Sequence, residues 1–329
     1  MESILALGLV IVGLIILCLG GYTLVLGGVA LARRLQISSM VIGLTVVAYG
    51  TSTPELAASI TAAMNSHTDL ILGNIVGSNI SNVGMVIGIS AMLAVGAWSG
   101  IGTGLGIREK TIKVWIPIMV LVSVVLVLIS FDGEISQFEG LGLIVGLIGF
   151  TIFTVKRAKK QTPRGDIVED EDPEVDMHFT KIRITGVPRA LLFIGIGSFL
   201  LFLGGKYTVD GAVGISESLG ISQLVIGIVI IAIGTSLPEL VTSVIAIRKG
   251  QMDIGVGNII GSNIYNILLI GGIAATIIGI PVSSDTFSHY YIMIAFSLVL
   301  FVGFRKYIPK PVGIGLVAAF AIYLGSLLV

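Results

Sequence analysis

Apolar runs of roughly 20 residues recur along this chain of 329 residues and are separated by short polar stretches. A helix needs about 20 apolar residues to cross the hydrocarbon core of a bilayer, so each run predicts one membrane-spanning helix. We predict ten spans, with approximate boundaries at residues 4–32, 37–64, 70–97, 112–130, 138–155, 188–216, 222–247, 253–280, 289–304 and 311–328. The pattern therefore predicts an all-α membrane protein with ten transmembrane helices.

The basic residues between the predicted spans indicate an orientation. Of the 19 Lys and Arg residues, 18 follow spans one, three, five, seven or nine, so they share one side of the membrane. Lys and Arg accumulate in cytoplasmic loops, and this side is therefore predicted to face the cytoplasm. We expect a multi-pass protein of the cell membrane, with both termini outside and the central linker inside.

The chain also contains an internal repeat. Residues Leu35–Asn82 align with Leu219–Asn266 without a gap at an offset of 184, and 24 of the 48 positions are identical. Five spans per half is an odd number, so the two halves are predicted to cross the membrane in opposite directions. Such inverted repeats are typical of secondary transporters. A duplicated packing module without a transport role is the alternative interpretation.

The repeat divides the chain into three parts. The N-terminal five-helix repeat covers residues 1–160, with a repeated core at about 35–97, and the C-terminal repeat covers 186–329, with a core at about 219–280. Between them, residues 161–185 form a short polar linker that we expect to be solvated and cytoplasmic. Its acidic run lacks the alternating ligands and the glycine of an EF-hand loop, so it does not predict a Ca²⁺ site.

Each copy of the repeat carries a proline and a glutamate inside a predicted span. The copies read Gly-Thr-Ser-Thr-Pro-Glu at residues 50–55 and Gly-Thr-Ser-Leu-Pro-Glu at residues 234–239. Proline removes a helical hydrogen bond, so spans two and seven are predicted to be broken at the centre of the membrane. A carboxylate at that depth costs about 3 kcal/mol on insertion scales and marks a functional candidate, here Glu55 and Glu239. Carboxylates, hydroxyls and freed carbonyls together form an all-oxygen set that suits Na⁺ or Ca²⁺.

The second half of each repeat adds further polar side chains. It reads Gly-Asn-Ile-Val-Gly-Ser-Asn-Ile-Ser-Asn at residues 73–82 and recurs with two changes at residues 257–266. Ser78 and Asn82 lie four residues apart and share one helix face, as do Ser262 and Asn266. The two glycines of each copy predict close approach of helices, and helix packing is a sufficient explanation for them.

The composition excludes several classes of function. The chain is 55% hydrophobic and 12% charged, with a mean hydropathy of +1.05, whereas a soluble domain is about 25% charged. A single cysteine excludes an intrachain disulfide and a thiolate metal cluster. The sequence has no nucleophile–base pair, phosphate-binding loop or His/Cys cluster. We therefore expect no enzyme, no cofactor, no nucleic-acid partner and no required protein partner, and we expect the lipid bilayer as the surrounding.

The two motifs together resemble the α-repeats of the cation/Ca²⁺ exchanger superfamily, and the chain is most similar to the prokaryotic Na⁺/Ca²⁺ exchangers. The close resemblance covers about 100 residues in the two repeats, and the ten-span layout with its central loop extends it to the whole chain. The resemblance implies an antiporter that moves Ca²⁺ one way and Na⁺ the other through one central site. In such proteins spans one and six slide against a core of the other eight to open each side in turn.

The resemblance also implies a set of ion ligands, by motif position. Glu55 and Glu239 would be shared between Ca²⁺ and Na⁺. The other implied ligands supply hydroxyl, backbone carbonyl or amide oxygens, and they are Thr51 and Thr235, Ser52 and Ser236, Ser78 and Ser262, Ala48 and Ala232, and Asn82 and Asn266.

One departure from the family pattern concerns charge. Many such exchangers carry an aspartate in place of one of the two asparagines, whereas Asn82 and Asn266 are both amides here. Two carboxylates neutralise one Ca²⁺, but three Na⁺ would leave the site one charge positive, which a low dielectric makes costly. The Na⁺:Ca²⁺ stoichiometry, the coupling to Na⁺ or H⁺ and any dependence on K⁺ stay open at this point.

Three other functions compete with Ca²⁺/Na⁺ exchange by alternating access. A Ca²⁺/H⁺ antiporter on the same scaffold would use the same acidic pair. A cation channel would need a continuous pore and would pass ions without a counter-ion, which paired broken helices do not favour. A non-transporting membrane scaffold does not explain oxygen-rich helix faces inside the bilayer.

Overall fold

Helices make up most of the structure. The computed structural model describes residues 2–94, 104–160, 174–177, 180–184, 186–219 and 232–327. Within these ranges, seven helical segments are long and apolar enough to cross a membrane: Leu5–Leu35, Thr68–Leu93, Thr111–Ile129, Gln137–Ala158, Val187–Ser216, Met252–Ile278 and Thr286–Gly303. Large apolar side chains such as Leu5 and Phe138 are exposed on their outer faces. Apolar surface on this scale needs a lipid environment, so the chain is an all-helical membrane protein.

These seven segments correspond to seven of the ten predicted spans. The second predicted span is present as a helix broken at Ser52, and the tenth is the 17-residue helix α16 (Lys310–Ser326). The seventh begins within residues 220–231, which lie outside the described residues together with the end of the third at residues 95–97. Length and hydropathy of the described residues therefore support seven spans, and the count of ten stays a prediction.

The two repeats are built from similar series of short helical segments. The first comprises α2 (Ser39–Ile42), the π-helical turn η1 (Gly43–Val47), α3 (Ala48–Thr51), α4 (Thr53–Met64), α5 (Thr68–Ser81), the π-helical turn η2 (Asn82–Ile87) and α6 (Gly88–Leu93). The described part of the second comprises α11 (Ala232–Thr235), α12 (Leu237–Arg248), α13 (Met252–Tyr265), the π-helical turn η5 (Asn266–Gly271) and α14 (Gly272–Ile278). The π-helical turns η2 and η5 begin at equivalent asparagines.

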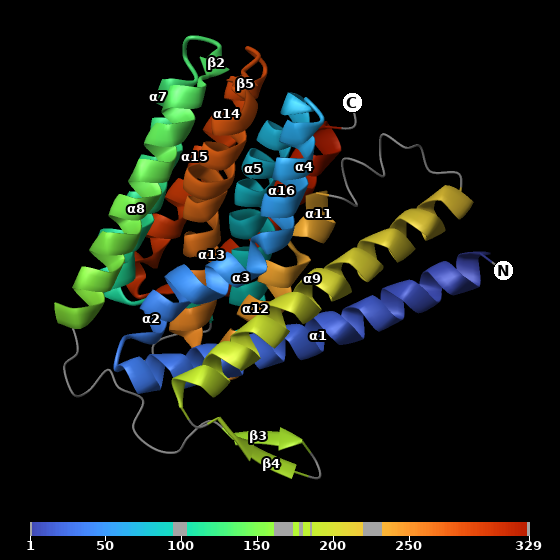
Figure 1. Ribbon diagram of the computed structural model, residues 1–329, viewed down its shortest axis with the longest axis vertical. Helices are drawn as coiled ribbons and strands as arrows, with labels where there is room; N and C mark the ends of the chain where they lie inside the picture. The colour runs from blue at the N-terminus through green and yellow to red at the C-terminus, as the bar shows by residue number, and fades with distance from the viewer. Residues whose placement is uncertain are drawn as a thin grey trace.

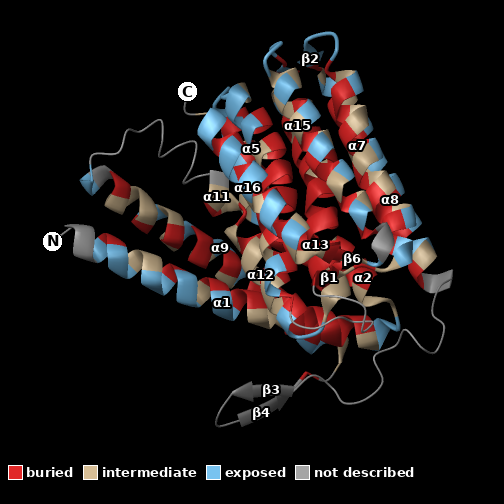
Figure 2. Ribbon diagram, turned by 180° about the vertical axis from the view of Figure 1, so that it is seen from behind, coloured by how far each residue is buried: buried red, intermediate tan, exposed pale blue. Residues whose placement is uncertain are grey.

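The remaining helices surround these repeats. They are α7 (Ile116–Ile129), preceded by the π-helical turn η3 (Thr111–Trp115), α8 (Gln137–Lys160) and α15 (Thr286–Val299), followed by the 3₁₀ helix η6 (Leu300–Arg305). Burial decides which segments form the interior. The segments Thr68–Leu93 and Met252–Ile278 are 78% and 83% buried, whereas the other five candidate spans are 22–44% buried. The repeated motifs thus lie in the core of the bundle (Figure 2).

Helices α1 (Glu2–Leu35) and α9 (Val187–Ser218) lie side by side and are inclined to the rest of the bundle (Figure 1). Glycines recur every seven residues on both of them, at positions 13, 20 and 27 and at positions 197, 204 and 211. A Cβ atom on Gly20 would lie 2.7 Å from the backbone N of Leu201, and one on Gly197 would lie 2.5 Å from that of Leu24. Only glycine permits this approach, so the two backbones form one closely packed pair.

The described residues include three short antiparallel strand pairs, each between loop segments. Strand β1 (Gly104–Gly106) pairs with β6 (Tyr307–Pro309), and β2 (Glu134–Ile135) pairs with β5 (Ile280–Pro281). Within the linker, β3 (Glu174–Met177) pairs with β4 (Thr180–Arg183). The polar composition of the linker does not predict this last pair, because composition averages over the whole segment and does not resolve a four-residue pairing.

Candidate cation site

Both predicted helix breaks are present at equivalent serines. Helix α3 ends at Thr51, and Ser52 leaves the helical conformation with φ −84° and ψ 10° before α4 begins. In the second repeat α11 ends at Thr235, and Ser236 has φ −87° and ψ 1° before α12 begins. A proline stands in the first turn of α4 and of α12 and cannot donate to the carbonyl four residues before it. The sequence therefore interrupts both helices at the same point.

Each break places a glutamate in the first turn of the following helix. Glu55 in α4 is 1% exposed and Glu239 in α12 is 0% exposed, so both carboxylates are buried within the protein rather than directed at lipid. Ser52, which immediately precedes α4, donates to Glu239 Oε1 at 3.1 Å, so the two helix breaks meet in the interior. The positive end of each helix dipole partly compensates the buried charge. This brings two negative groups, one from each repeat, into a shared interior region.

Hydroxyl groups from both repeats surround Glu239. Its Oε1 accepts hydrogen bonds from Ser52 Oγ at 3.1 Å and from Ser262 Oγ at 3.4 Å. The Thr51 hydroxyl lies 3.4 Å from Ser262 Oγ and donates to Asn258 Oδ1 at 2.9 Å. Residues of the first helix break thus contact α12 and α13 of the second repeat, which joins the two motifs into one polar cluster.

Four asparagines form a reciprocal bracket between the repeats. Asn82 Nδ2 donates to Asn263 Oδ1 at 3.0 Å, and the equivalent Asn266 Nδ2 donates to Asn79 Oδ1, also at 3.0 Å. Asn82 and Asn266 are the first residues of η2 and η5, and single π-helical turns of this kind are frequent at functional sites. These hydrogen bonds hold the side-chain amides of Asn82 and Asn266 by their nitrogen atoms and leave their oxygen atoms unbonded.

Several buried oxygens in this region have no hydrogen-bond partner within the described ranges. They are Glu55 Oε2, Glu239 Oε2, Asn82 Oδ1, Asn266 Oδ1 and Ser236 Oγ. Leaving a buried polar atom unpaired costs about 1–3 kcal/mol, and more for a charged one. Carboxylate, amide and hydroxyl oxygens are ligands for hard cations, so the set can complete itself by binding a cation.

The described residues hold no cluster of three or more His, Cys, Asp and Glu side chains. A cation in this region would therefore be bound by two carboxylates together with neutral oxygens. That donor set is unsuited to soft or thiophilic metals and suits alkali and alkaline-earth ions.

The predicted site residues fall into three groups. Ten are buried, and they are Ala48, Thr51, Ser52, Glu55, Ser78, Asn82, Ser236, Glu239, Ser262 and Asn266. Thr235 is half-buried at the end of α11, and Ala232 begins that helix. Hydrogen bonds connect Ser52, Ser262 and Thr51 to one another or to Glu239, whereas Ser78 donates to Asn74 Oδ1 at 3.4 Å.

The sequence interpretation did not single out the asparagines that hold the site in place. Besides Asn79 and Asn263, these include Asn74, whose Nδ2 donates to the Glu55 carbonyl at 3.0 Å and to Ser59 Oγ at 2.8 Å. The equivalent Asn258 Nδ2 donates to Ser243 Oγ at 3.0 Å. Their identity at matching positions of both repeats was the available signal.

Glycines bring α13 against the first helix break. A Cβ on Gly261 would lie 2.6 Å from both Ala48 Cβ and Leu44 O, and one on Gly257 would lie 2.9 Å from Met40 O. This confirms the predicted close approach for the second repeat. The segment equivalent to residues 40–48 is 224–232, most of which lies outside the described residues.

Comparison with known proteins agrees with this architecture. The family model described as sodium/calcium exchanger protein matches residues 5–156 and 189–329. The inner membrane protein YrbG of Escherichia coli is 32% identical over 330 residues, covering 98% of this chain and 97% of that protein. The sodium/calcium exchanger MaX1 of Methanosarcina acetivorans is 32% identical over 324 residues, covering 89% of each.

A solved structure gives the same result. The sodium-calcium exchanger NCX_Mj, soaked with 2.5 mM Na⁺ and 0.1 mM Ca²⁺, is similar with a TM-score of 0.80 and 29% sequence identity, covering 98% of each chain. The family match spans both repeats, and both helix breaks lie within it. The chain therefore belongs to the sodium/calcium exchanger family of membrane transporters.

Proposed function

We propose that this chain is an antiporter that exchanges Ca²⁺ for Na⁺ by alternating access through one central site built around Glu55 and Glu239. As a member of the sodium/calcium exchanger family it is a transporter rather than an enzyme, and the transported ions are its substrates. The names of MaX1 and NCX_Mj specify sodium and calcium, which supports the same pair of ions here.

The observation that carries the proposal is the paired set of buried oxygens. Glu55 and Glu239 each have one carboxylate oxygen, and Asn82 and Asn266 each have one amide oxygen, without a hydrogen-bond partner in the described part of the chain. A dehydrated cation would supply the missing partner to all four. Ca²⁺ and Na⁺ would need the same two carboxylates, so occupancy by one excludes the other and the two ions compete.

The proposal includes the finer architecture. The protein would have ten membrane-spanning helices as two inverted repeats of five, with broken helices 2 and 7, both termini outside and the linker in the cytoplasm. The one-sided distribution of 18 basic residues supports this arrangement. The glycine-packed pair α1 and α9, inclined to the bundle in Figure 1, would move against the other helices as one unit.

Charge balance bears on the stoichiometry. With Asn82 and Asn266 both neutral, the site holds two formal negative charges, which one Ca²⁺ or two Na⁺ would neutralise. A third Na⁺ would leave a net positive charge in a buried region and would depend on carbonyl dipoles for compensation. We therefore propose exchange of two Na⁺ for one Ca²⁺, which moves no net charge.

The test is ⁴⁵Ca²⁺ uptake by protein reconstituted into liposomes that contain Na⁺ and are diluted into Na⁺-free buffer. Uptake driven by the outward Na⁺ gradient and insensitive to a proton uncoupler is the expected result. Uptake that requires an imposed pH gradient and ignores Na⁺ would instead identify a Ca²⁺/H⁺ antiporter. Uptake without any counter-ion would identify a channel.

Two additions to the same assay sharpen the result. Replacing external choline by K⁺, at a clamped membrane potential, tests whether K⁺ is co-transported, and no change in rate is expected. Varying the membrane potential with valinomycin tests the charge moved per cycle. A rate independent of potential would agree with two Na⁺ per Ca²⁺, and a steep dependence would contradict it.

A further inference from the structure

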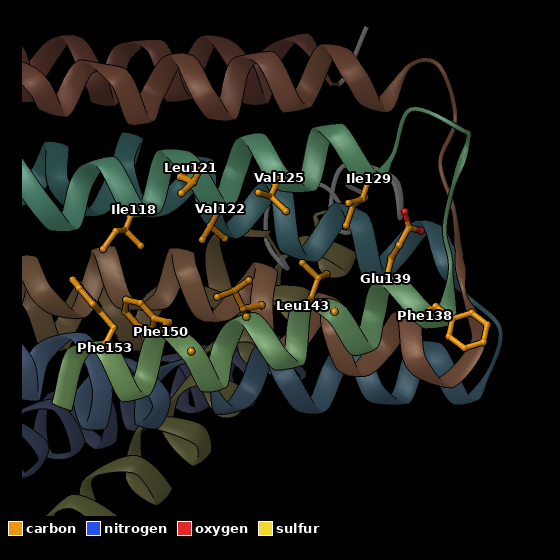
Figure 3. Close-up of a pocket in the computed structure, with 14 residues that line it drawn as sticks. Ile118, Leu121, Val122, Val125, Ile129, Phe138, Glu139, Leu143, Phe150 and Phe153 are labelled. Carbon is orange, nitrogen blue, oxygen red and sulfur yellow. The ribbon is translucent and has the colours of Figure 1, made fainter. Parts of the chain in front are cut away.

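A long apolar groove separates α7 from α8 on the outer side of the bundle. It has a volume of about 850 Å³. Apolar side chains of α7 and α8 line it, including Ile118, Val122 and Val125 on one wall and Leu143, Phe150 and Phe153 on the other. Figure 3 shows the α7 side chains directed toward α8 along the length of the groove, with Glu139 at one end and Phe153 at the other.

Glycines on α8 leave this groove open. Gly142, Gly146 and Gly149 line it. A Cβ placed on Gly142 or Gly149 would meet no atom of the described residues within 4 Å, and one on Gly146 would be 3.5 Å from Leu268 Cδ2. The space between the helices is therefore not filled by side chains of the described chain.

The length of the groove matches one lipid tail. Its walls run from Ile118 to Ile129 on α7 and from Phe138 to Phe153 on α8. At a rise of 1.5 Å per residue these distances are about 17 and 22 Å. One leaflet contributes about half of the ~30 Å hydrocarbon core, so a tail that enters at one end fits within the groove.

An aromatic cluster stands at one end of the groove, beside basic side chains. Trp115 makes edge-on contacts with Phe150 and Phe153, with ring centres 6.3 and 5.9 Å apart. The guanidinium carbon of Arg157 lies 5.7 Å from the centre of the Phe153 ring. Beyond Trp115 lies a small cavity of about 40 Å³, and Ser38, Arg108, Lys110, Thr111, Arg157 and Asp253 contribute to its lining.

Among the residues that the structure describes, basic side chains outnumber acidic ones at this end. Arg108 forms an ion pair with Asp253 at 2.7 Å, and Lys113 pairs with Glu109. Arg157 and Lys110 have no carboxylate within ion-pair distance in the ranges that the structure describes. The opposite end carries Glu139. The two ends of the groove therefore differ in charge.

The Glu139 carboxylate caps the N-terminus of its own helix, α8. Its Oε2 accepts hydrogen bonds from the backbone N and the Oγ of Ser136, at 2.7 and 2.8 Å, in a capping-box arrangement. This end therefore offers a negative charge and no donor to an anionic group.

We propose that the groove between α7 and α8 binds one anionic phospholipid, with an acyl chain along the groove and the phosphate at Arg157 and Lys110. Apolar walls at membrane depth select a lipid tail, and the unbalanced basic end selects an anionic headgroup over a zwitterionic one. Lys110 directly precedes the span Thr111–Ile129 and Arg157 stands at the end of the span Gln137–Ala158, so both lie near the level of the lipid headgroups. The proposal is independent of which ions the protein transports.

The test is native mass spectrometry of the full-length protein in micelles that contain equal amounts of phosphatidylglycerol and phosphatidylcholine with identical acyl chains. Wild type is expected to retain one phosphatidylglycerol in preference to phosphatidylcholine. Arg157→Gln and Lys110→Gln should each reduce this preference about fivefold. The matched control is Lys249→Gln, because Lys249 stands over the Tyr22 ring at 3.9 Å and lines neither cavity, and it should keep the preference.

Filling the groove tests the position of the tail. Gly149→Leu should abolish retention of both lipids, whereas Gly315→Leu in α16, where the described residues also leave space, should bind as wild type. Equal retention of the two lipids by wild type would overturn the proposal. Competition by millimolar inorganic phosphate would overturn the assignment to a lipid. A dimer that Gly149→Leu dissociates would show that a second copy of the chain covers the groove.

Discussion

The two glutamates of this protein share nearly the same sequence context but differ in their surroundings. Glu239 Oε1 accepts hydrogen bonds from Ser52, which belongs to the first repeat, and from Ser262, which belongs to the second. The equivalent hydroxyls behave differently. Ser236 Oγ has no partner among the described residues, and Ser78 donates to an asparagine instead.

A matching difference separates the two asparagines that support these helices. Asn258 Oδ1 accepts from Thr51 across the repeat boundary at 2.9 Å. The equivalent Asn74 Oδ1 accepts from Ser78 of its own repeat at 3.4 Å. Thr51 and Ser52 of the first helix break are therefore hydrogen-bonded to Asn258 and Glu239 of the second repeat.

By contrast, the amide bracket is symmetric. The Asn82–Asn263 and Asn266–Asn79 hydrogen bonds have the same atoms and the same 3.0 Å length. We infer that the bracket is a fixed part of the site and that the hydroxyls around the glutamates are its variable part. An alternating-access carrier needs both, because its two repeats must exchange conformations around a constant set of ligands.

The largest expected effect follows removal of either carboxylate. Glu55→Gln and Glu239→Gln should each lower the rate of Na⁺-driven ⁴⁵Ca²⁺ uptake by more than about 100-fold. Mutating a residue that only supports a metal ligand typically costs about 10- to 100-fold, and removing a charged ligand should cost more. Glu139→Gln is the control, since glutamine can keep the capping bond at the start of α8. A variant of either glutamate that retains the wild-type rate would exclude it from the site.

A smaller loss is expected when the bracket is cut. Asn79→Ala and Asn263→Ala should weaken the apparent affinity for Ca²⁺ about 10- to 100-fold, because each frees the amide of Asn266 or Asn82 to rotate. The control is Asn65→Ala, whose exposed amide bonds only the carbonyl of Thr61. Equal effects of the two bracket variants would agree with its symmetry, and a silent variant would show that the bond does not orient the ligand.

The next largest effect is expected on stability, when the close packing of α13 against the first helix break is disturbed. Gly261→Ala should destabilise the protein by about 1–3 kcal/mol, because the new methyl group would lie 2.6 Å from Ala48 Cβ and Leu44 O. Gly315→Ala in α16 should have little effect, since no described atom lies within 4 Å of its added Cβ. Thermal unfolding in detergent measures both. Equal destabilisation by the two variants would show that the close contact at Gly261 does not limit stability.

The smallest effect should separate the two serines at the helix breaks. Ser52→Ala removes a buried hydrogen bond to Glu239 and should reduce Ca²⁺ affinity about tenfold. Ser236→Ala removes one unpaired hydroxyl from the oxygen set that a cation would complete, but breaks no hydrogen bond to a glutamate, and should reduce Ca²⁺ affinity by a smaller factor than Ser52→Ala. A larger loss of affinity in Ser236→Ala than in Ser52→Ala would show that the Ser52–Glu239 hydrogen bond is not the more important of the two serine contributions.

The sequence predicted the breaks in the two helices and the burial of their glutamates for identifiable reasons. A proline within an apolar run disrupts a helix wherever it stands, and a carboxylate within such a run must find polar surroundings. These rules act on a few adjacent residues, so a repeat at an offset of 184 was sufficient to locate both copies. The resemblance then supplied the remaining ligand positions, which stay predictions.

The bracket could not be predicted in the same way. Asn79 and Asn82 contact Asn266 and Asn263, about 180 residues away, and no local pattern specifies that pairing. The π-helical turns that begin at Asn82 and Asn266 could not be predicted either, because these segments are buried on nearly all sides and a one-residue shift of helical phase leaves no trace in a pattern that is apolar all round. Ser52 donates to Glu239, whereas Ser236 Oγ has no partner among the described residues, and two nearly identical motifs do not predict that difference.

The most direct test of the central claim is equilibrium binding of Ca²⁺ to the purified protein by isothermal titration calorimetry in Na⁺-free buffer. The account predicts one Ca²⁺ per chain, displaced by Na⁺, with binding lost in Glu55→Gln and equally in Glu239→Gln. Retention of full Ca²⁺ affinity by either variant, or two independent Ca²⁺ ions per chain, would contradict a single ion held jointly by the two repeats.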